Sequence, residues 1–407
     1  MPETSIFHRK QLASKLADSA LQTSATSASG SGVFLAAPRR TGKSTFVRED
    51  LRPELEAKGA LVLYVDLWTD RRADPGDVMV SAVRTELAKY EGVITRLAKS
   101  SGMDKVTVGG LGFSLDRVGL GAQVSITTAL AALSDEVRKP IVFIIDEVQH
   151  AITTDKGYDA LFALKAARDE LNSSAHHGLH IIATGSNRDK LAMLRNSKDQ
   201  AFFGAPLVSF PHLGDDYVQW FCDGVDLPAP LDVGQIRKLF ERALFRPEIL
   251  GAAADALRFD LELAAADVRK KFTAAVDAEI EADQERTLRV IRGLTPLQSA
   301  VLRVLAAYGE KYAPFEPATF NTYRMVLHEI DPKYKAKPEI SNVQQALIAL
   351  QEKSLIWKEK RGIYSLEESA TAELLSNRGL MSLHGMKQKP DQADTDTKPS
   401  GASPRSK

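Results

Sequence analysis

The stretch Phe34-Leu-Ala-Ala-Pro-Arg-Arg-Thr-Gly-Lys-Ser-Thr-Phe46 decides the fold. It reads as an apolar strand, a loop and the start of a helix. Except at its first position, the loop matches G-x-x-x-x-G-K-S/T, in which backbone N–H groups and a helix N-terminus surround nucleotide phosphates, the lysine neutralises their charge and the hydroxyl ligates magnesium. Ala37 replaces the first glycine, so the turn there must suit an alanine. The residues expected to bind nucleotide are Ala37, Pro38, Arg39, Arg40, Thr41, Gly42, Lys43, Ser44 and Thr45.

A second motif is Ile141-Val-Phe-Ile-Ile-Asp-Glu147, an apolar run that ends in two acids. It predicts a buried strand with carboxylates at its C-terminal end, where ligands bind in parallel α/β folds. Adjacent acids there repel each other and lose hydration unless a cation compensates. We therefore expect Asp146 to hold magnesium through water and Glu147 to deprotonate the attacking water. The alternative is a strand exit with two solvated acids.

A third stretch, His180-Ile-Ile-Ala-Thr-Gly-Ser-Asn-Arg188, ends another predicted strand in polar residues. A neighbouring strand can place Ser186 or Asn187 beside the same water and γ-phosphate. The alternative for each residue is a Gly-Ser-Asn turn followed by a helix cap.

Three arginines are further candidates for binding the nucleotide. Arg188 and Arg195 can supply an arginine finger to a neighbouring subunit, because charge that develops on the transferred phosphoryl group favours a guanidinium. Arg246 precedes a predicted helix and can contact the nucleotide from the other side. For Arg188 and Arg195 a solvated surface position is the competing interpretation.

Four separated motifs can be compared with known families by their order along the chain. They are Phe34 to Thr45, Tyr64-Val-Asp-Leu-Trp68, Ile144-Ile-Asp-Glu-Val-Gln149 and Ala183-Thr-Gly-Ser-Asn187. Together they resemble the P-loop ATPases of the AAA+ and archaeal-ATPase type. The resemblance covers about residues 33–257.

This resemblance implies an α/β fold with a parallel sheet, in which the acidic strand lies between the P-loop strand and its neighbours, followed by a small helical lid. It also implies ATP and Mg²⁺ as cofactors, with Lys43, Ser44 and Asp146 as binding residues and Glu147 as the catalytic base. Hydrolysis fits better than a kinase reaction, because P-loop kinases do not need a water-activating acid directly after the magnesium-side aspartate.

The rest of the sequence predicts the other segments and domains of the chain. Leu12, Leu16 and Leu21 suggest an N-terminal helix, and Gly-rich alternation over 106–124 suggests an inserted antiparallel hairpin. Short apolar runs that alternate with amphipathic segments predict the α/β domain. The expected parts are an N-terminal helix and entry loop (1–32), the P-loop ATPase domain (33–215), a helical lid and connector (216–292), a winged-helix domain (293–370) and a disordered tail (386–407).

The segment from 293 to 370 predicts three helices followed by a hairpin that turns at Arg361-Gly362, the order of a winged helix-turn-helix. Lysines lie where a winged helix meets DNA phosphates, and polar residues of the predicted recognition helix can reach base edges. The lysines and the wing arginine are Lys333, Lys335, Lys337, Lys358, Lys360 and Arg361, and the polar residues are Asn342, Gln344 and Gln345. The alternative is a winged helix used only for protein contacts.

Composition narrows the classes of protein. Lysine plus arginine and aspartate plus glutamate both total 53, so a globally basic coat for nucleic acid is excluded and any such surface is a local patch. The single cysteine, Cys222, cannot form an intramolecular disulfide. No apolar run is long enough for a membrane span, and we expect a cytoplasmic protein without a membrane partner.

The sequence thus predicts a magnesium-dependent ATPase whose nucleotide state controls a winged helix that binds double-stranded DNA. The alternative is a slow, STAND-like, nucleotide-gated switch that binds a partner protein and no DNA. ATP is the expected ligand in both cases, and the sequence leaves self-association into a homo-oligomer open.

Overall fold

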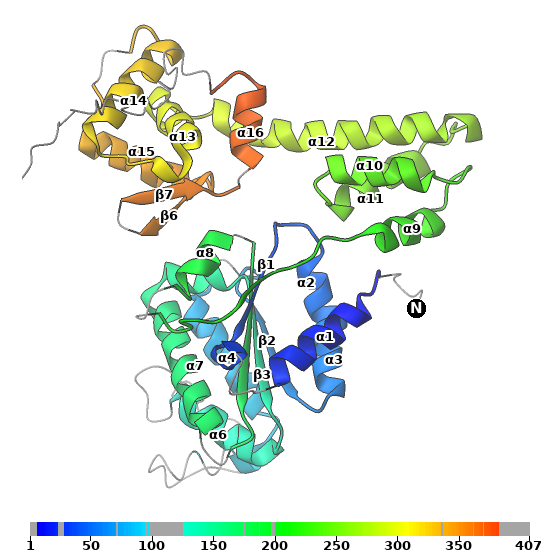
Figure 1. Ribbon diagram of the computed structural model, residues 1–407, viewed down its shortest axis with the longest axis vertical. Coiled ribbons are helices and arrows are strands. Elements are labelled where there is room, and N and C mark those ends of the chain that lie inside the picture. The colour runs from blue at the N-terminus through cyan, green and yellow to red at the C-terminus, as the bar shows by residue number, and fades with distance from the viewer. Residues whose placement is uncertain are drawn as a thin grey trace, which may run out of the picture. The chain divides into compact units, whose positions relative to one another are not determined.

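The computed structural model describes residues 6–22, 28–70, 72–93, 97, 125–173, 176–186, 188–196, 200–334, 337–360, 362–368 and 370–381. The chain forms two compact units, Met1–Arg286 and Thr287–Lys407 (Figure 1). The predicted hairpin at 106–124 and the predicted tail at 386–407 lie outside the described residues.

The first unit is built on a five-stranded parallel sheet in the order β2-β3-β4-β1-β5. Its strands are β1 (Val33–Ala36), β2 (Leu61–Asp66), β3 (Ile141–Asp146), β4 (Leu179–Gly185) and β5 (Leu207–Ser209). The prediction of a parallel α/β sheet is confirmed. The acidic strand β3 lies between β2 and β4, so β4 separates it from the P-loop strand β1, whereas the resemblance had led us to expect it beside β1.

Helices cover both faces of this sheet (Figure 1). Side chains alternate between the faces along each strand: Phe34 and Phe143 belong to one core, and Leu35 and Val142 to the other. The first core includes residues of α4 (Pro75–Leu87), α6 (Ile126–Val137) and α7 (Asp155–Ser173), and the second includes residues of α1 (Lys10–Leu21), α2 (Lys43–Phe46), the π-helical turn η2 (Val47–Leu51) and α3 (Arg52–Ala57). Both faces are buried, which explains the continuous apolar runs of β3 and β4.

The predicted N-terminal helix is present as α1, and alanines make up its buried face. Ala13, Ala17 and Ala20 are buried, while Leu12, Leu16 and Leu21 are only partly buried beside the core. Small side chains allow the helix backbone to approach its neighbours closely, and the leucines then cover the rim of that contact.

Four helices follow the sheet and share a core of their own. They are α9 (Asp215–Gly224), α10 (Val233–Arg242), α11 (Pro247–Arg258) and α12 (Val268–Arg292). Tyr217, Phe240, Leu250 and Phe272 are buried within this core. The predicted helical segment at 216–292, which we call the lid segment, is therefore present, and its last helix α12 contains the boundary between the two units.

The second unit contains helices α13 (Pro296–Tyr308), α14 (Pro317–Ile330) and α15 (Ile340–Glu352), followed by the antiparallel strands β6 (Ile356–Lys360) and β7 (Ile363–Leu366) and by α16 (Ala370–Asn377). The order of three helices and a hairpin agrees with the sequence prediction. Thr295 begins α13 through a capping box with Gln298, and Gly362 after the first strand has φ +82°.

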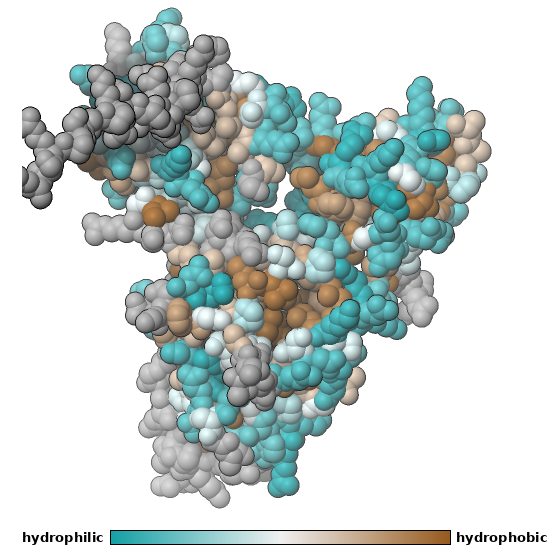
Figure 2. Space-filling model, in the orientation of Figure 1, coloured by the Kyte–Doolittle hydropathy of each residue, from teal (hydrophilic) through white to brown (hydrophobic). Residues whose placement is uncertain are grey.

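Hydrophilic residues cover much of the face shown in Figure 2, with apolar residues between them. Across the part of the chain that the structure describes, every helix is too short or too polar to cross a membrane.

A glycine in α7 tests how the fold supports the acidic strand. A Cβ atom on Gly157 would lie 2.1 Å from the backbone oxygen of Ala151, in the turn that follows Glu147. We expect Gly157→Ala to destabilise the protein by on the order of 1–3 kcal/mol, because backbone has to move. Gly251→Ala is the control: nothing lies within 4 Å of its Cβ in α11, so this variant should gain about 0.5–1 kcal/mol. Urea denaturation would measure both, and equal stability of the two variants would contradict the packing described here.

Candidate nucleotide site

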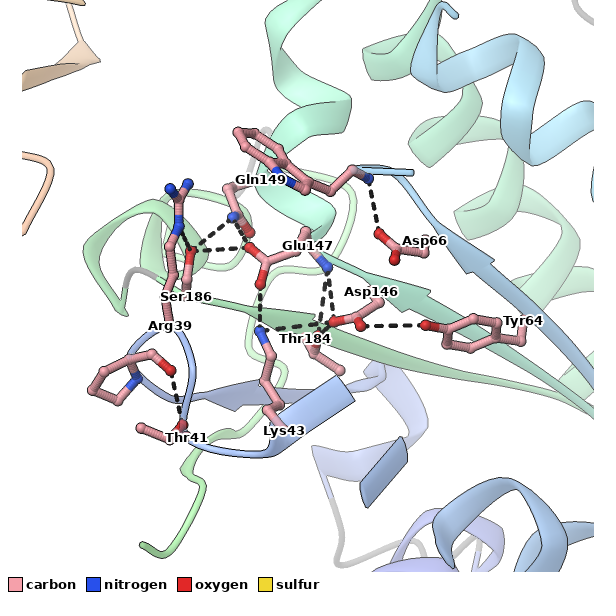
Figure 3. A network of polar contacts seen from close by, with 12 residues as sticks. Arg39, Thr41, Lys43, Tyr64, Asp66, Asp146, Glu147, Gln149, Thr184 and Ser186 are labelled. Atoms are coloured by element: carbon pink, nitrogen blue, oxygen red, sulfur yellow. Dashed lines mark hydrogen bonds and ion pairs between the residues drawn. The ribbon is translucent and has the colours of Figure 1, made fainter. Parts of the chain in front are cut away.

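The P-loop joins the carboxyl end of β1 to helix α2 (Figure 3). Left-handed backbone occurs at Arg40 (φ +63°) and Gly42 (φ +82°), and the Thr41 hydroxyl donates to the Pro38 carbonyl at 2.8 Å. Ala37 is not among the residues with positive φ, and its N–H donates to the Gly185 carbonyl. The first position of this loop therefore continues the strand geometry, which accounts for alanine in place of glycine.

Lys43 brings the two sequence motifs together. Its Nζ atom lies 2.7 Å from Oε1 of Glu147 and 3.7 Å from Oδ1 of Asp146, and its side chain is only 5% exposed. The carboxyl ends of parallel strands and the helix that follows β1 meet at the same edge of a sheet, which places these residues in contact although they are distant in sequence. The prediction that the P-loop and the paired acids converge agrees with this geometry.

Asp146 is fully buried and held on several sides. It accepts hydrogen bonds from the hydroxyl of Thr184 on β4, from the Tyr64 hydroxyl at 3.3 Å and from the Glu147 backbone N–H at 3.1 Å. The pKa of Tyr64 is raised mainly by burial and also by the charge of Asp146, so this hydroxyl stays protonated and donates. The competing interpretation, a solvated acid at a strand exit, does not describe this residue.

Glu147 has left-handed backbone (φ +56°), which directs its carboxylate toward Lys43, Gln149 and Ser186. Ser186 donates to Oε2 at 2.9 Å, and Gln149 donates to the same oxygen. Burial alone would raise the pKa of Glu147, but Lys43 and these two donors outweigh it and lower the pKa below its ordinary value. The carboxylate is therefore ionised at neutral pH, the form that a base requires.

The remaining sequence candidates lie in different places. The Ser186 hydroxyl lies at the Glu147 carboxylate, and its contact with the attacking water and the γ-phosphate stays a prediction. Asn187 lies outside the described residues, and Arg188 begins helix α8 (Arg188–Met193) with a side chain that is also outside them. Arg195 donates to the Ala205 carbonyl and to the Asn196 side chain, so its guanidinium holds the segment that leads to β5.

Arg246 lies in the lid segment, and its guanidinium is bound there. It contacts Asp283 of α12 at 2.5 Å and Glu248 at 2.8 Å, with a side chain that is 17% exposed. Arg40 of the P-loop reaches the same aspartate at 3.3 Å, and Arg286 does so at 2.9 Å. Asp283 thus connects the P-loop to the lid segment.

Several residues of this site were not predicted from the sequence. Gln149 stands in the quoted acidic motif, so its position two residues after Glu147 was a usable signal. Tyr64 and Thr184 face Asp146 from the strands on either side of β3, and Asp283 faces Arg40 from a helix. Only the strand order and the placement of α12 reveal these three.

Comparisons with known proteins agree with this arrangement. No protein-family model matches the chain, and no curated protein sequence matches it. Among solved structures, the ADP form of the ORC2 protein of Aeropyrum pernix is similar, with a TM-score of 0.54 and 14% identity over 93% of this chain and 96% of that one. A Walker-type ATPase of Pyrococcus abyssi is similar with a TM-score of 0.51 and 15% identity over 91% of this chain and 96% of that one.

This is the fold of the AAA+ P-loop ATPases. At such low identity the likeness concerns the fold, and the roles of single residues rest on the geometry of this chain. In the AAA+ fold seen here, the P-loop, the acidic strand and the end of β4 share one edge of the sheet, as Figure 3 shows.

The residues of this site fit magnesium. The hydroxyl of Ser44 forms no hydrogen bond within the described chain, and the carboxylate of Asp146 lies 3.7 Å from Nζ of the preceding residue, Lys43. Hydroxyl and carboxylate oxygens are hard donors suited to Mg²⁺, which usually shares its ligands with phosphates and water. Within the described ranges no group of three His, Cys, Asp or Glu forms a metal cage.

Asp283 allows a pH test of the link between the P-loop and the lid segment. Burial would raise its pKa, but hydrogen bonds from Arg246 and Arg286 outweigh this and lower the pKa to about 2. The carboxylate therefore stabilises the fold above the pKa of an unfolded aspartate, about 3.9, and this contribution is lost as the pH falls toward 2.

We expect Asp283→Asn to lower the free energy of unfolding by about 1 kcal/mol at pH 7, after allowance for solvent screening, and by much less near pH 2. Urea titrations at several pH values would measure this. Asp255→Asn is the control, because its pair with Arg258 is exposed on both sides and should contribute less than about 0.5 kcal/mol. A pH-independent effect of Asp283→Asn would contradict the assignment.

Proposed function

We propose that this chain is a magnesium-dependent ATPase whose nucleotide state controls its C-terminal unit. The observation that carries the proposal is the position of Lys43, whose Nζ lies between the carboxylates of Asp146 and Glu147 at the mouth of the P-loop. A buried cation beside two acids at a helix N-terminus provides separate places for a phosphate, a metal ion and a water molecule.

Each residue has a role in the proposed reaction. Lys43 binds the β- and γ-phosphates, Ser44 and Asp146 hold magnesium, and Glu147 takes a proton from the attacking water. Ser186 and Gln149 keep the Glu147 carboxylate aimed at that water through their hydrogen bonds. Magnesium, when bound, neutralises charge on the phosphate oxygens. When ATP occupies the site, Lys43 turns from Glu147 to the phosphates and leaves this carboxylate available as a base.

Helix α12 supports the proposed control of the second unit. It carries Asp283, which contacts Arg40 of the P-loop, and it also carries Ile291, which belongs to the core of the second unit. Phosphates bound by the P-loop would compete with Asp283 for Arg40. We propose that this competition transmits the nucleotide state along α12.

For the second unit we propose a winged helix that binds double-stranded DNA. Lys333, Lys337 and Lys358 are exposed, which suits contacts with phosphates. Lys335 and Arg361 lie outside the described residues, as does the side chain of Lys360.

Asn342, one of the residues predicted to contact DNA bases, caps a helix instead. The Asn342 side chain accepts from the Glu339 N–H and donates to the Lys337 carbonyl, so it caps the start of α15. Gln344 and Gln345 are exposed on α15 and remain candidates for base contacts.

A protein-binding switch is the second candidate, and one observation favours it. Helix α15 contains no lysine or arginine, and it exposes Ile340 (61%) and Ile348 (48%). Exposed isoleucines on a helix without basic residues suit a protein partner better than DNA. Salt dependence separates the two, because neutralised phosphates release counterions whereas apolar contacts do not. Self-association into a homo-oligomer stays a prediction that gel filtration with and without ATP would test.

Two substitutions test hydrolysis. We expect Lys43→Ala to abolish ATP binding, because the phosphates lose their buried cation. Glu147→Gln should bind ATP and slow hydrolysis by about 10²–10⁴, the usual contribution of a general base. Calorimetry and phosphate release would measure binding and turnover, and hydrolysis by Glu147→Gln at the parental rate would refute the assigned base.

One substitution tests DNA binding. We expect duplex affinity to fall with rising salt, and Lys358→Ala to weaken binding and to reduce the slope of log K against log salt by about 1. Lys270→Ala, which removes an exposed lysine from the first unit, should leave both unchanged. Fluorescence anisotropy at several salt concentrations would measure this. Salt-insensitive or absent binding would favour the protein-binding switch.

A further inference from the structure

We propose that a cavity in the second unit binds a small aliphatic carboxylate, with arginine side chains at its carboxylate group and aliphatic side chains around its hydrocarbon chain. The cavity has a volume of about 350 Å³, and small-molecule sites span about 300–1,000 Å³. The residues that line it all belong to the unit Thr287–Lys407. This inference goes beyond the proposed ATPase and winged helix, because neither assigns a ligand to this cavity.

Most of the cavity wall is aliphatic. Leu288 and Ile291 at the end of α12 are 1% and 4% exposed, and Ile330 ends α14. Leu294 and Leu380 extend the same wall, and Figure 1 shows α16, which precedes Leu380, beside the end of α12. No aromatic side chain is among the described residues that line it. A hydrocarbon chain therefore fits this wall better than a nucleobase, which proteins commonly bind by stacking on aromatic rings.

Three arginines give the cavity a positive charge. Arg292, Arg303 and Arg378 line it, and no aspartate or glutamate of the described chain does so. Arg292 has a further interaction of its own, whereas Arg303 and Arg378 form no ion pair with the described residues. An anion placed among guanidinium groups forms charge-assisted hydrogen bonds with them. The charge of the cavity is thus complementary to a carboxylate.

Arg303 of α13 carries the inference, because its guanidinium lacks an acceptor. Its Nε atom is buried and has no hydrogen-bond partner within the described part of the chain. Burial lowers the pKa of Arg303, and the opposing effect of the nearby Glu329 charge is smaller. A buried donor without an acceptor is costly, and proteins rarely leave one unpaired. A carboxylate bound in the cavity would bring acceptor oxygens to this guanidinium.

The first turn of α13 adds a hydroxyl group to the same wall. Ser299 is 7% exposed, lines the cavity and forms no side-chain hydrogen bond within the described residues. It precedes Arg303 by four residues, so both side chains lie on one face of α13. A serine hydroxyl can donate to one carboxylate oxygen while a guanidinium donates to the other.

The aliphatic wall and the arginines together decide the class of ligand. A phosphate ion would pair with the arginines but leave the aliphatic wall in contact with water. An uncharged lipid would cover that wall but leave Arg303 without an acceptor. A hydrocarbon chain that ends in a carboxylate satisfies both, and each methylene group that it buries should strengthen binding about fourfold.

The experiment measures binding to the full chain by isothermal titration calorimetry. The probes are octanoate, decanoate, 1-octanol, inorganic phosphate and a short peptide of leucine and glutamate that is capped at both ends. Arg303→Met keeps an aliphatic stem without the charge, and Arg378→Ala changes an exposed residue. The matched control is Arg324→Ala, because Arg324 is an exposed arginine of α14 that does not line the cavity. Thermal unfolding verifies that each variant is folded.

We expect one octanoate to bind per chain, and decanoate to bind about tenfold more tightly because it buries two more methylene groups. Binding of 1-octanol should be about tenfold weaker or worse, because it loses the charge-assisted hydrogen bonds. Arg303→Met should remove the preference for octanoate over 1-octanol. Arg378→Ala should weaken octanoate binding about threefold, since solvent screens an exposed charge, and Arg324→Ala should stay within about twofold of the parent.

Equal affinity of the parent for octanoate and 1-octanol would overturn the proposal, as would unchanged octanoate affinity in both Arg303→Met and Arg378→Ala. The second variant keeps the test decisive if the first does not fold. Phosphate binding as tight as octanoate binding would contradict a role for the aliphatic wall, and binding of the peptide alone would assign the cavity to a protein partner instead. These outcomes leave the proposed ATPase untouched, because Lys43 and Glu147 belong to the first unit.

Discussion

The contact of the Lys43 ammonium group with the carboxylates of Asp146 and Glu147 is the interaction on which the rest of the site depends. None of these charges could be buried alone, because each would lose its hydration without compensation. Together they fix the end of the P-loop helix against the end of the acidic strand. Hydroxyl and amide donors around them also hydrogen-bond to the two carboxylates.

Under the proposed function, this cluster prepares the site for phosphate. Lys43 would turn to the phosphates, and a metal ion and a water molecule would take over the acids that Lys43 contacts. The buried carboxylates would then face a cation both before and after nucleotide binding, first the lysine and then the metal ion.

The two neighbouring arginines of the P-loop contact different parts of the protein. Arg39 lies along the sheet edge beside Trp68 and Ser186, whereas Arg40 turns toward Asp283 in α12. The positive φ of Arg40 separates their directions. One loop therefore contacts both Ser186 beside Glu147 and the helix α12.

Local sequence determined much of this protein. The loop from Phe34 to Phe46, the apolar run before Asp146 and the capping residue Thr295 specify their strand, turn and helix through nearest-neighbour chemistry, and all three elements are present. The leucines of α1 indicated a helix, but its buried alanine face depends on how closely the helix approaches its neighbours, which periodicity alone does not reveal.

Only the tertiary structure decided which residues meet. The sheet order placed β4 between the P-loop strand and the acidic strand, and this brought Thr184 and Ser186 to the carboxylates. The packing of α12 against the start of α11 likewise paired Arg246 with Asp283. The physical reason is the distance along the chain over which each effect acts. Strand and turn preferences depend on a few neighbouring residues, whereas ion pairs and hydrogen bonds between distant segments exist only after the strands and helices have packed.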